Sequence, residues 1–279
     1  SSDVCSSDLA GGNLLIEAGH DVAITASDVS AKGNATLSAA NNLQLNAAQT
    51  SESSKQSKGN KETHSSGSDR TTISSGGNLV LAAGQDLTSQ AAAIVADGDV
   101  GLQAGRDINL NAEESRTGNS ERGSKKTVIN ETVRQQGTEI VSGGNATLVA
   151  GNDITSQAST LTANNDLALQ AGHDVNITTA TESDYAYKEE TKTKKGLFSK
   201  KTTHTISEES STAEKASQLS GDRVSIIAGN DLTVKGSSVI GEGDVGLKAG
   251  NDLTIAAATD TQTSYRLSET KKSGMFSGG

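Results

Sequence analysis

One short phrase recurs along this chain: an alternating apolar run, the tetrapeptide Ala-Gly-x-Asp, and a second alternating run. Full copies of the tetrapeptide begin at Ala18, Ala83, Ala104, Ala150, Ala171, Ala228 and Ala249, and a degenerate copy begins at Ala39. Inside a block, neighbouring copies lie 21 residues apart, as Gly84 and Gly105 do. A fixed period near 20 residues is typical of a solenoid, in which each repeat contacts only its neighbours.

The residues around each tetrapeptide alternate between apolar and polar. Val224, Ile226 and Ala228 precede one corner, and Leu232 and Val234 follow it. This two-residue period is that of a strand with one buried face. At the corner we expect glycine to supply a positive φ and the aspartate to bond its own downstream amide. The sequence therefore predicts an all-β fold, a right-handed parallel β-helix (β-solenoid) of about 21 residues per coil.

The repeats fall into blocks at 11–48, 76–112, 143–180 and 221–258. Polar inserts at 49–75, 113–142, 181–220 and 259–279 separate and follow them, and we expect β-hairpins or flexible loops there. Residues 1–10 do not fit the repeat and resemble a translated adapter, so they are predicted to be a non-native leader, and Cys5 is given no role. Residues 11–279 are predicted to form one repeat β-helix that is a fragment of a larger protein.

The repeat blocks read Gly-Asn-x-x-Leu-x-Ala-Gly-x-Asp-Leu-x-Ile, which resembles the haemagglutinin repeats of the filamentous-haemagglutinin family. The insert phrase Lys195-Gly196-Leu197-Phe198-Ser199 and its echo at residues 273–277 resemble that family too. The resemblance implies a secreted or cell-surface exoprotein of a Gram-negative bacterium, exported through an outer-membrane transporter by two-partner secretion. It is greatest to the contact-dependent growth-inhibition toxins. The family's secretion and toxin domains have no counterpart here.

The recurring aspartates are the first candidates for chemistry. Stacked coils would bring them into acidic ladders, which suits calcium, but the glycine-rich nonapeptide of calcium-binding β-rolls is absent. We therefore prefer a structural corner and predict no metal site and no cofactor. His20 and His173 occupy the variable position of the corner, which favours exposure and no metal role. No position gathers a unique group of acids and bases, so we predict that the chain is not an enzyme.

The insert tips are the best candidates for contact with a partner. Lysines flank an apolar pair there, and the candidate contact residues are Lys194, Lys195, Leu197, Phe198, Met275 and Phe276. A cationic collar around an apolar tip suits an anionic lipid surface. The alternative, which we prefer because it buries aromatic surface, is that Phe198 folds back and pins its hairpin on the solenoid.

The net charge of −10 argues against nucleic-acid binding, which needs a basic surface. The resemblance to the growth-inhibition toxins implies a structural stalk segment that helps deliver a C-terminal toxin to neighbouring bacteria across the target cell's outer membrane. The alternative is the shaft of a filamentous-haemagglutinin-type adhesin that binds host cells or biofilm matrix.

Overall fold

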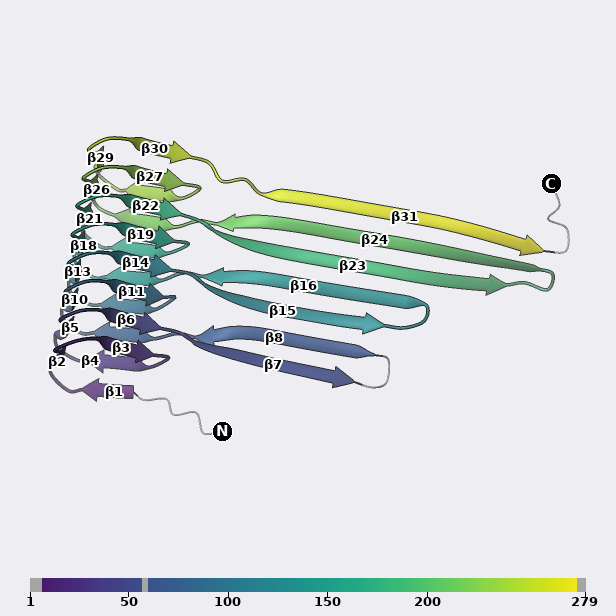
Figure 1. Cartoon of the computed structure of the whole chain (residues 1–279), viewed down its shortest axis with the longest axis horizontal. Helices are drawn as coiled ribbons and strands as arrows, with labels where there is room; N and C mark the ends of the chain where they lie inside the picture. The colour runs from purple at the N-terminus through teal and green to yellow at the C-terminus, as the bar shows by residue number, and fades with distance from the viewer. Residues whose placement is uncertain (1–6, 57–59, 275–279) are drawn as a thin grey trace.

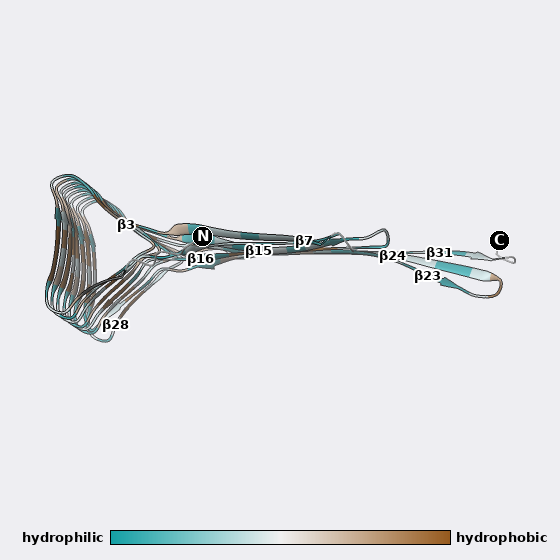
Figure 2. Ribbon diagram, turned by 90° about the horizontal axis from the view of Figure 1, so that it is seen from below, coloured by the Kyte–Doolittle hydropathy of each residue, from teal (hydrophilic) through white to brown (hydrophobic). Residues whose placement is uncertain are grey.

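The computed structural model describes residues 7–56 and 60–274, with the side chains of residues 7–9 left out. These residues form strands, turns and bends without a helix. They build a solenoid of three parallel sheets and a flat antiparallel sheet that projects from it, which we call the fin (Figures 1 and 2). The prediction of an all-β parallel β-helix with hairpin inserts is confirmed.

Each coil of the solenoid contributes one strand to each of three eight-stranded sheets. The first sheet contains β1 (Ser7–Ala10), β4 (Asp28–Ala31), β9 (Thr72–Ser75), β12 (Ala93–Ala96), β17 (Glu139–Ser142), β20 (Thr160–Ala163), β25 (Gln218–Gly221) and β28 (Ser238–Gly241). The second contains β2 (Leu14–Ala18), β5 (Ala35–Ala39), β10 (Leu79–Ala83), β13 (Val100–Ala104), β18 (Ala146–Ala150), β21 (Leu167–Ala171), β26 (Val224–Ala228) and β29 (Val245–Ala249). The third contains β3 (Val22–Thr25), β6 (Leu43–Asn46), β11 (Leu87–Gln90), β14 (Ile108–Asn111), β19 (Ile154–Gln157), β22 (Val175–Thr178), β27 (Leu232–Lys235) and β30 (Leu253–Ala256).

The coils are triangular in outline (Figure 2), and the strand register stacks their buried aliphatic side chains. In the second sheet the central ladder runs through Leu37, Leu81, Leu102, Leu148, Leu169 and Ile226, all buried. Burying each such side chain contributes about 1.5–3 kcal/mol. Because the coils themselves have a constant length, with the hairpins inserted at a corner, a leucine in one coil stands over a leucine or isoleucine in the next. This register fixes the stack.

Close packing between coils requires the glycines of the tetrapeptides after the first, Gly19. The positive φ expected for these glycines is wrong. Gly236, which lies outside the tetrapeptides, is the one described glycine with a positive φ. At Gly105, Gly151, Gly172 and Gly250, a Cβ would overlap the carbonyl oxygen of the equivalent glycine one coil earlier. The backbones approach closely at this corner because each glycine amide donates to the alanine carbonyl of the coil before, as Gly105 does to Ala83 at 3.0 Å.

The fin consists of the strands of the polar inserts. They are β7 (Ala48–Gln56), β8 (Lys61–Asp69), β15 (Glu113–Arg122), β16 (Lys126–Gln136), β23 (Ala180–Lys195), β24 (Ser199–Lys215) and β31 (Thr261–Gly274). They lie side by side in the order β31-β24-β23-β16-β15-β8-β7. The hairpins lengthen along the chain, from 9 residues in β7 to 16 in β23, so the last ones reach furthest from the solenoid (Figure 1).

The hairpins leave the solenoid at one corner and at every second coil. The coils between them close this corner with short turns at Ala26, Ala91, Ala158 and Gly236, whose φ values are 47°, 52°, 48° and 56°. Two coils rise about 9.6 Å along the axis, and two neighbouring strands of a sheet occupy the same distance. Successive hairpins therefore meet edge to edge and pair, as β8 does with β15 and β16 with β23.

Four strands of the first sheet lie outside the predicted repeat blocks. β9, β17 and all of β25 but Gly221 fall within the predicted inserts, because the chain returns from each hairpin before the boundary chosen from the sequence. β1 falls within the predicted leader, and its backbone pairs in parallel with β4. Cys5 lies outside the described residues. The division into leader, blocks and inserts otherwise stays a prediction.

Candidate functional site

The first candidate site is the distal end of the fin, which we call the tip: residues 194–201 with Lys271 and Lys272. β23 and β24 are joined here by a tight turn in which the Gly196 amide donates to the Ser199 carbonyl at 2.7 Å. The strand register places Lys194 opposite Lys201 and Lys195 opposite Lys200. On the far side of β24, Lys201 stands opposite Lys272 of β31. The structure thus brings together lysines from two segments that are about 70 residues apart in the sequence.

The tip carries positive charge that no described acid neutralises in an ion pair. Residues 191–204 and 270–274 contain no Asp or Glu, and none of the six tip lysines forms an ion pair within the described ranges. Closer to the solenoid, Lys192 contacts Glu190 at 2.9 Å. Hydrogen bonding from Lys192, with the charge of Lys188 adding to it, lowers the pKa of Glu190. The balance of charge therefore changes sharply between the body of the fin and its tip.

Two apolar side chains cap the turn. Leu197 is 91% exposed and Phe198 is 63% exposed. The interpretation that Phe198 folds back to pin its hairpin on the solenoid is wrong, because residue 198 lies at the distal end of the fin, far from the coils (Figure 1). The equivalent pair in the next insert, Met275 and Phe276, lies outside the described residues.

One face of the fin carries tyrosines and aliphatic side chains interleaved with glutamates. Residues opposite each other on neighbouring strands share a face, and the register aligns Ile129, Tyr187, Glu208 and Tyr265 across β16, β23, β24 and β31. The Tyr187 hydroxyl donates to Glu189 at 3.1 Å on this face, and partial burial raises the pKa of Tyr187. Sequence reasoning missed this face because it appears only when four separate segments are aligned.

The second candidate is the row of aspartates at the tetrapeptide corner. Each aspartate was expected to bond its own downstream amide, and this is wrong. The carboxylate oxygen instead accepts a hydrogen bond from a backbone amide of the next coil. Asp153 Oδ1 accepts the amide of Asp174 at 2.9 Å, and Asp174 Oδ1 accepts the amide of Asp231 at 3.0 Å. The reason is that stacking places equivalent corners one strand spacing apart, within reach of a short side chain.

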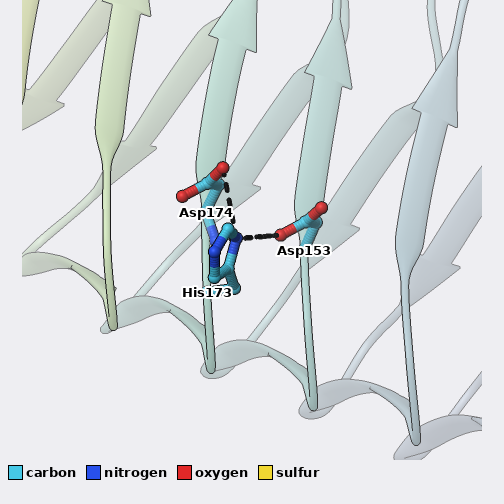
Figure 3. A group of neighbouring side chains, drawn as sticks. All are labelled: Asp153, His173 and Asp174. Carbon is cyan, nitrogen blue, oxygen red and sulfur yellow. Dashed lines mark hydrogen bonds and ion pairs between the residues drawn. The ribbon is translucent and has the colours of Figure 1, made fainter.

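In five tetrapeptides the side chain of the variable residue contacts an aspartate of the coil before. Arg106 pairs with Asp86, and the side chains of Asn152, Asn230 and Asn251 donate to the aspartates Asp107, Asp174 and Asp231. His173 fills the same role: its Nδ1 lies 3.3 Å from Asp153 Oδ1 and 3.2 Å from Asp174 Oδ2 (Figure 3). The position therefore selects an N–H donor that offsets the stacked carboxylates.

Asp153, His173 and Asp174 bring three potential metal ligands together, with the ligand atoms within 4.8 Å of one another. The group is open to solvent, and His173 makes the contact that arginine or asparagine makes in the other coils. Hydrogen bonds from the Asn230 side chain and the Asp231 amide are the main reasons why the pKa of Asp174 is lowered. The group thus makes the contacts of the structural corner, and the absence of a metal site stays a prediction.

The fold and its two candidate sites define a class: an interrupted β-solenoid with a lateral fin and a cationic tip. The described residues include no helix with the length and hydropathy that a membrane crossing needs. A family model for the hemagglutinin repeat matches the chain over residues 1–61, 53–130, 120–206 and 198–278. The chain therefore belongs to the hemagglutinin repeat family.

Several curated proteins resemble the chain over part of its length. A 16S rRNA endonuclease CdiA of Enterobacter cloacae is 53% identical over 187 residues, which cover 67% of this chain and 6% of that protein. A tRNA nuclease CdiA of Escherichia coli strain STEC_O31 is 50% identical over 186 residues, again 67% of this chain and 6% of that protein. A Deoxyribonuclease CdiA of Dickeya dadantii is 46% identical over 149 residues, 53% of this chain and 4% of that protein. No solved structure matches the chain.

Proposed function

We propose that this chain is a stalk segment of a secreted or surface-anchored Gram-negative exoprotein that helps deliver a C-terminal toxin to neighbouring bacteria by contact. The observation that carries this proposal is the identity of about 50% to the repeat regions of proteins named for three different nuclease activities. A segment that stays similar while the named activity differs suits a carrier. In this role the chain is not an enzyme, and it needs no cofactor.

The partners follow from the same role. An outer-membrane transporter of two-partner secretion would export the parent protein, and the outer membrane of the target cell would receive it. The solenoid suits export of an extended stalk, since each coil packs only on its neighbours and can fold as it emerges. We infer that the fin tip, with Lys194, Lys195, Leu197 and Phe198, is the part that contacts the target envelope, and we extend this to Met275 and Phe276 by sequence.

A chimera tests the delivery role. Residues 11–274 would replace the matching repeats in the Enterobacter relative, and the chimera would be displayed beside unmodified target bacteria. We expect growth inhibition that a target expressing the matching immunity protein resists. A control chimera would carry a solenoid of equal length without fin hairpins. If the first chimera reaches the cell surface but fails to inhibit, the proposed function is refuted, and adhesion of the same cells to host membranes would favour the adhesin.

A further inference from the structure

We propose that the fin tip is a binding site for the phosphate groups of an anionic lipid surface. This inference rests on the proposed function only for the identity of the membrane, and the chemistry of the tip carries the rest. The register sorts the lysines onto the two faces of the fin. Lys194, Lys201 and Lys272 form one cross-strand row on one face. Lys195 and Lys200 stand opposite each other on the other face.

Elsewhere in the described part of the fin no lysine stands opposite another lysine, and three stand opposite glutamates. Lys55 stands opposite Glu62, Lys61 opposite Glu121 and Lys126 opposite Glu190. Cross-strand pairs of opposite charge stabilise a sheet, and like charges directly opposite destabilise it. The tip reverses this pattern over two adjacent rows and in three strands. Such a cluster is costly in isolation, and an anionic partner that enters between the lysine side chains removes the cost.

The apolar turn distinguishes a lipid surface from other polyanions. Leu197 and Phe198 project beyond the last lysine rows and are largely exposed. A fin that meets a membrane end-on places both apolar side chains below the phosphate layer while the lysines on both faces remain level with it. A rod-like polyanion would lie along one face and leave the lysines of the other face unused. The acidic solenoid, in a chain with net charge −10, would also repel it.

Vesicle binding by the whole chain tests this proposal. The vesicles are phosphatidylcholine alone, phosphatidylcholine with phosphatidylglycerol, and phosphatidylcholine with lipopolysaccharide. The test variant is Lys194→Gln/Lys201→Gln/Lys272→Gln. The control variant, Lys32→Gln/Lys235→Gln/Lys248→Gln, removes the same charge from exposed sites on the solenoid, away from the tip. Circular dichroism confirms that each variant retains its β-structure.

We expect the wild type to bind both kinds of anionic vesicle, and phosphatidylcholine alone only weakly. Each lysine near an anionic surface contributes about fivefold, so the test variant should bind on the order of 100-fold more weakly. The control variant should bind within about threefold of the wild type, because its lysines lie beyond the screening length of the surface. Leu197→Ser/Phe198→Ser should bind anionic vesicles about tenfold more weakly than the wild type, although its charge is unchanged, because it buries less apolar surface in the membrane.

Equal losses in the test and control variants would overturn the proposal, since they would indicate a general effect of net charge. Absence of binding to anionic vesicles, or preference for single-stranded DNA over them, would also overturn it. Competition by millimolar inorganic phosphate would show that the site recognises free phosphate and would overturn the lipid assignment. The assay contains no toxin and no target cell, so its failure leaves the chimera experiment intact, and failure of the chimera leaves vesicle binding intact.

Discussion

Replacing Asp153 with alanine should loosen the joint between two successive coils at the tetrapeptide corner. Asp153 Oδ1 accepts the Asp174 amide at 2.9 Å and lies 3.3 Å from His173 Nδ1. Alanine removes the acceptor from both donors. Asparagine keeps an oxygen in the same place, and the structure contains this solution elsewhere, since Asn78 Oδ1 accepts the Asp99 amide at 2.9 Å.

The magnitude follows from the exposure of the corner. A hydrogen bond of this kind contributes about 0.5–1.5 kcal/mol net, and water can partly replace the lost acceptor at a half-exposed site. We therefore expect Asp153→Ala to cost about 1 kcal/mol of local stability, which corresponds to an equilibrium constant for local opening that is about fivefold larger. Asp153→Asn should cost close to nothing, because it keeps the acceptor and removes one negative charge from a stack of carboxylates.

Native-state hydrogen exchange measured by NMR gives the test. The Asp174 amide should exchange about fivefold faster in Asp153→Ala than in the wild type, and at the wild-type rate in Asp153→Asn. The Val175 amide, which donates to the Asp231 carbonyl at 2.9 Å, serves as an internal reference and should not change. Equal acceleration in both variants would refute the reasoning, because it would make the carboxylate charge, and not the acceptor oxygen, the source of the effect.

Three further outcomes are expected from the core and the corners. Leu148→Ala, in the middle of a fully buried ladder, should lower the free energy of unfolding by about 2–5 kcal/mol in urea titrations. Thr138→Val leaves the buried Ser89 hydroxyl without its 2.8 Å partner and should cost about 1–3 kcal/mol, whereas adding Ser89→Ala should restore much of it. The lowered pKa of Asp174 means that its contribution to stability is present above the ordinary carboxyl pKa and is lost as the pH falls through the lower folded value. The urea midpoints of Asp174→Asn and the wild type should therefore converge in acid.

The period and the alternation were sufficient to predict the fold, because the repeat period of a solenoid sequence equals the number of residues in one coil. The role of the corner residues could not be predicted in the same way. A glycine next to an aspartate fits a local turn as well as a tight contact between coils, and only the stacked backbone shows that Gly105 is limited by the carbonyl of Gly84. The exposure of Phe198 was missed because hairpin length, and not hydrophobicity, decides how far the side chain lies from the core.

The union of the hairpins into one fin had a signal in the sequence that was not used: each repeat block holds two tetrapeptide corners, so each insert follows two coils.

If matching of two coils to two strands builds the fin, deleting one coil should break it. Deletion of residues 72–92 removes β9, β10 and β11 and leaves the two flanking hairpins one coil apart. They then have about 4.8 Å of axial rise where about 9.6 Å is needed. Deletion of residues 72–138 removes two coils and one hairpin and keeps the alternation. We expect both variants to retain the solenoid, and only the first to lose exchange protection in the fin at the strands flanking the deletion. Unchanged protection there after the single-coil deletion would mean that the hairpins associate without regard to the coil period.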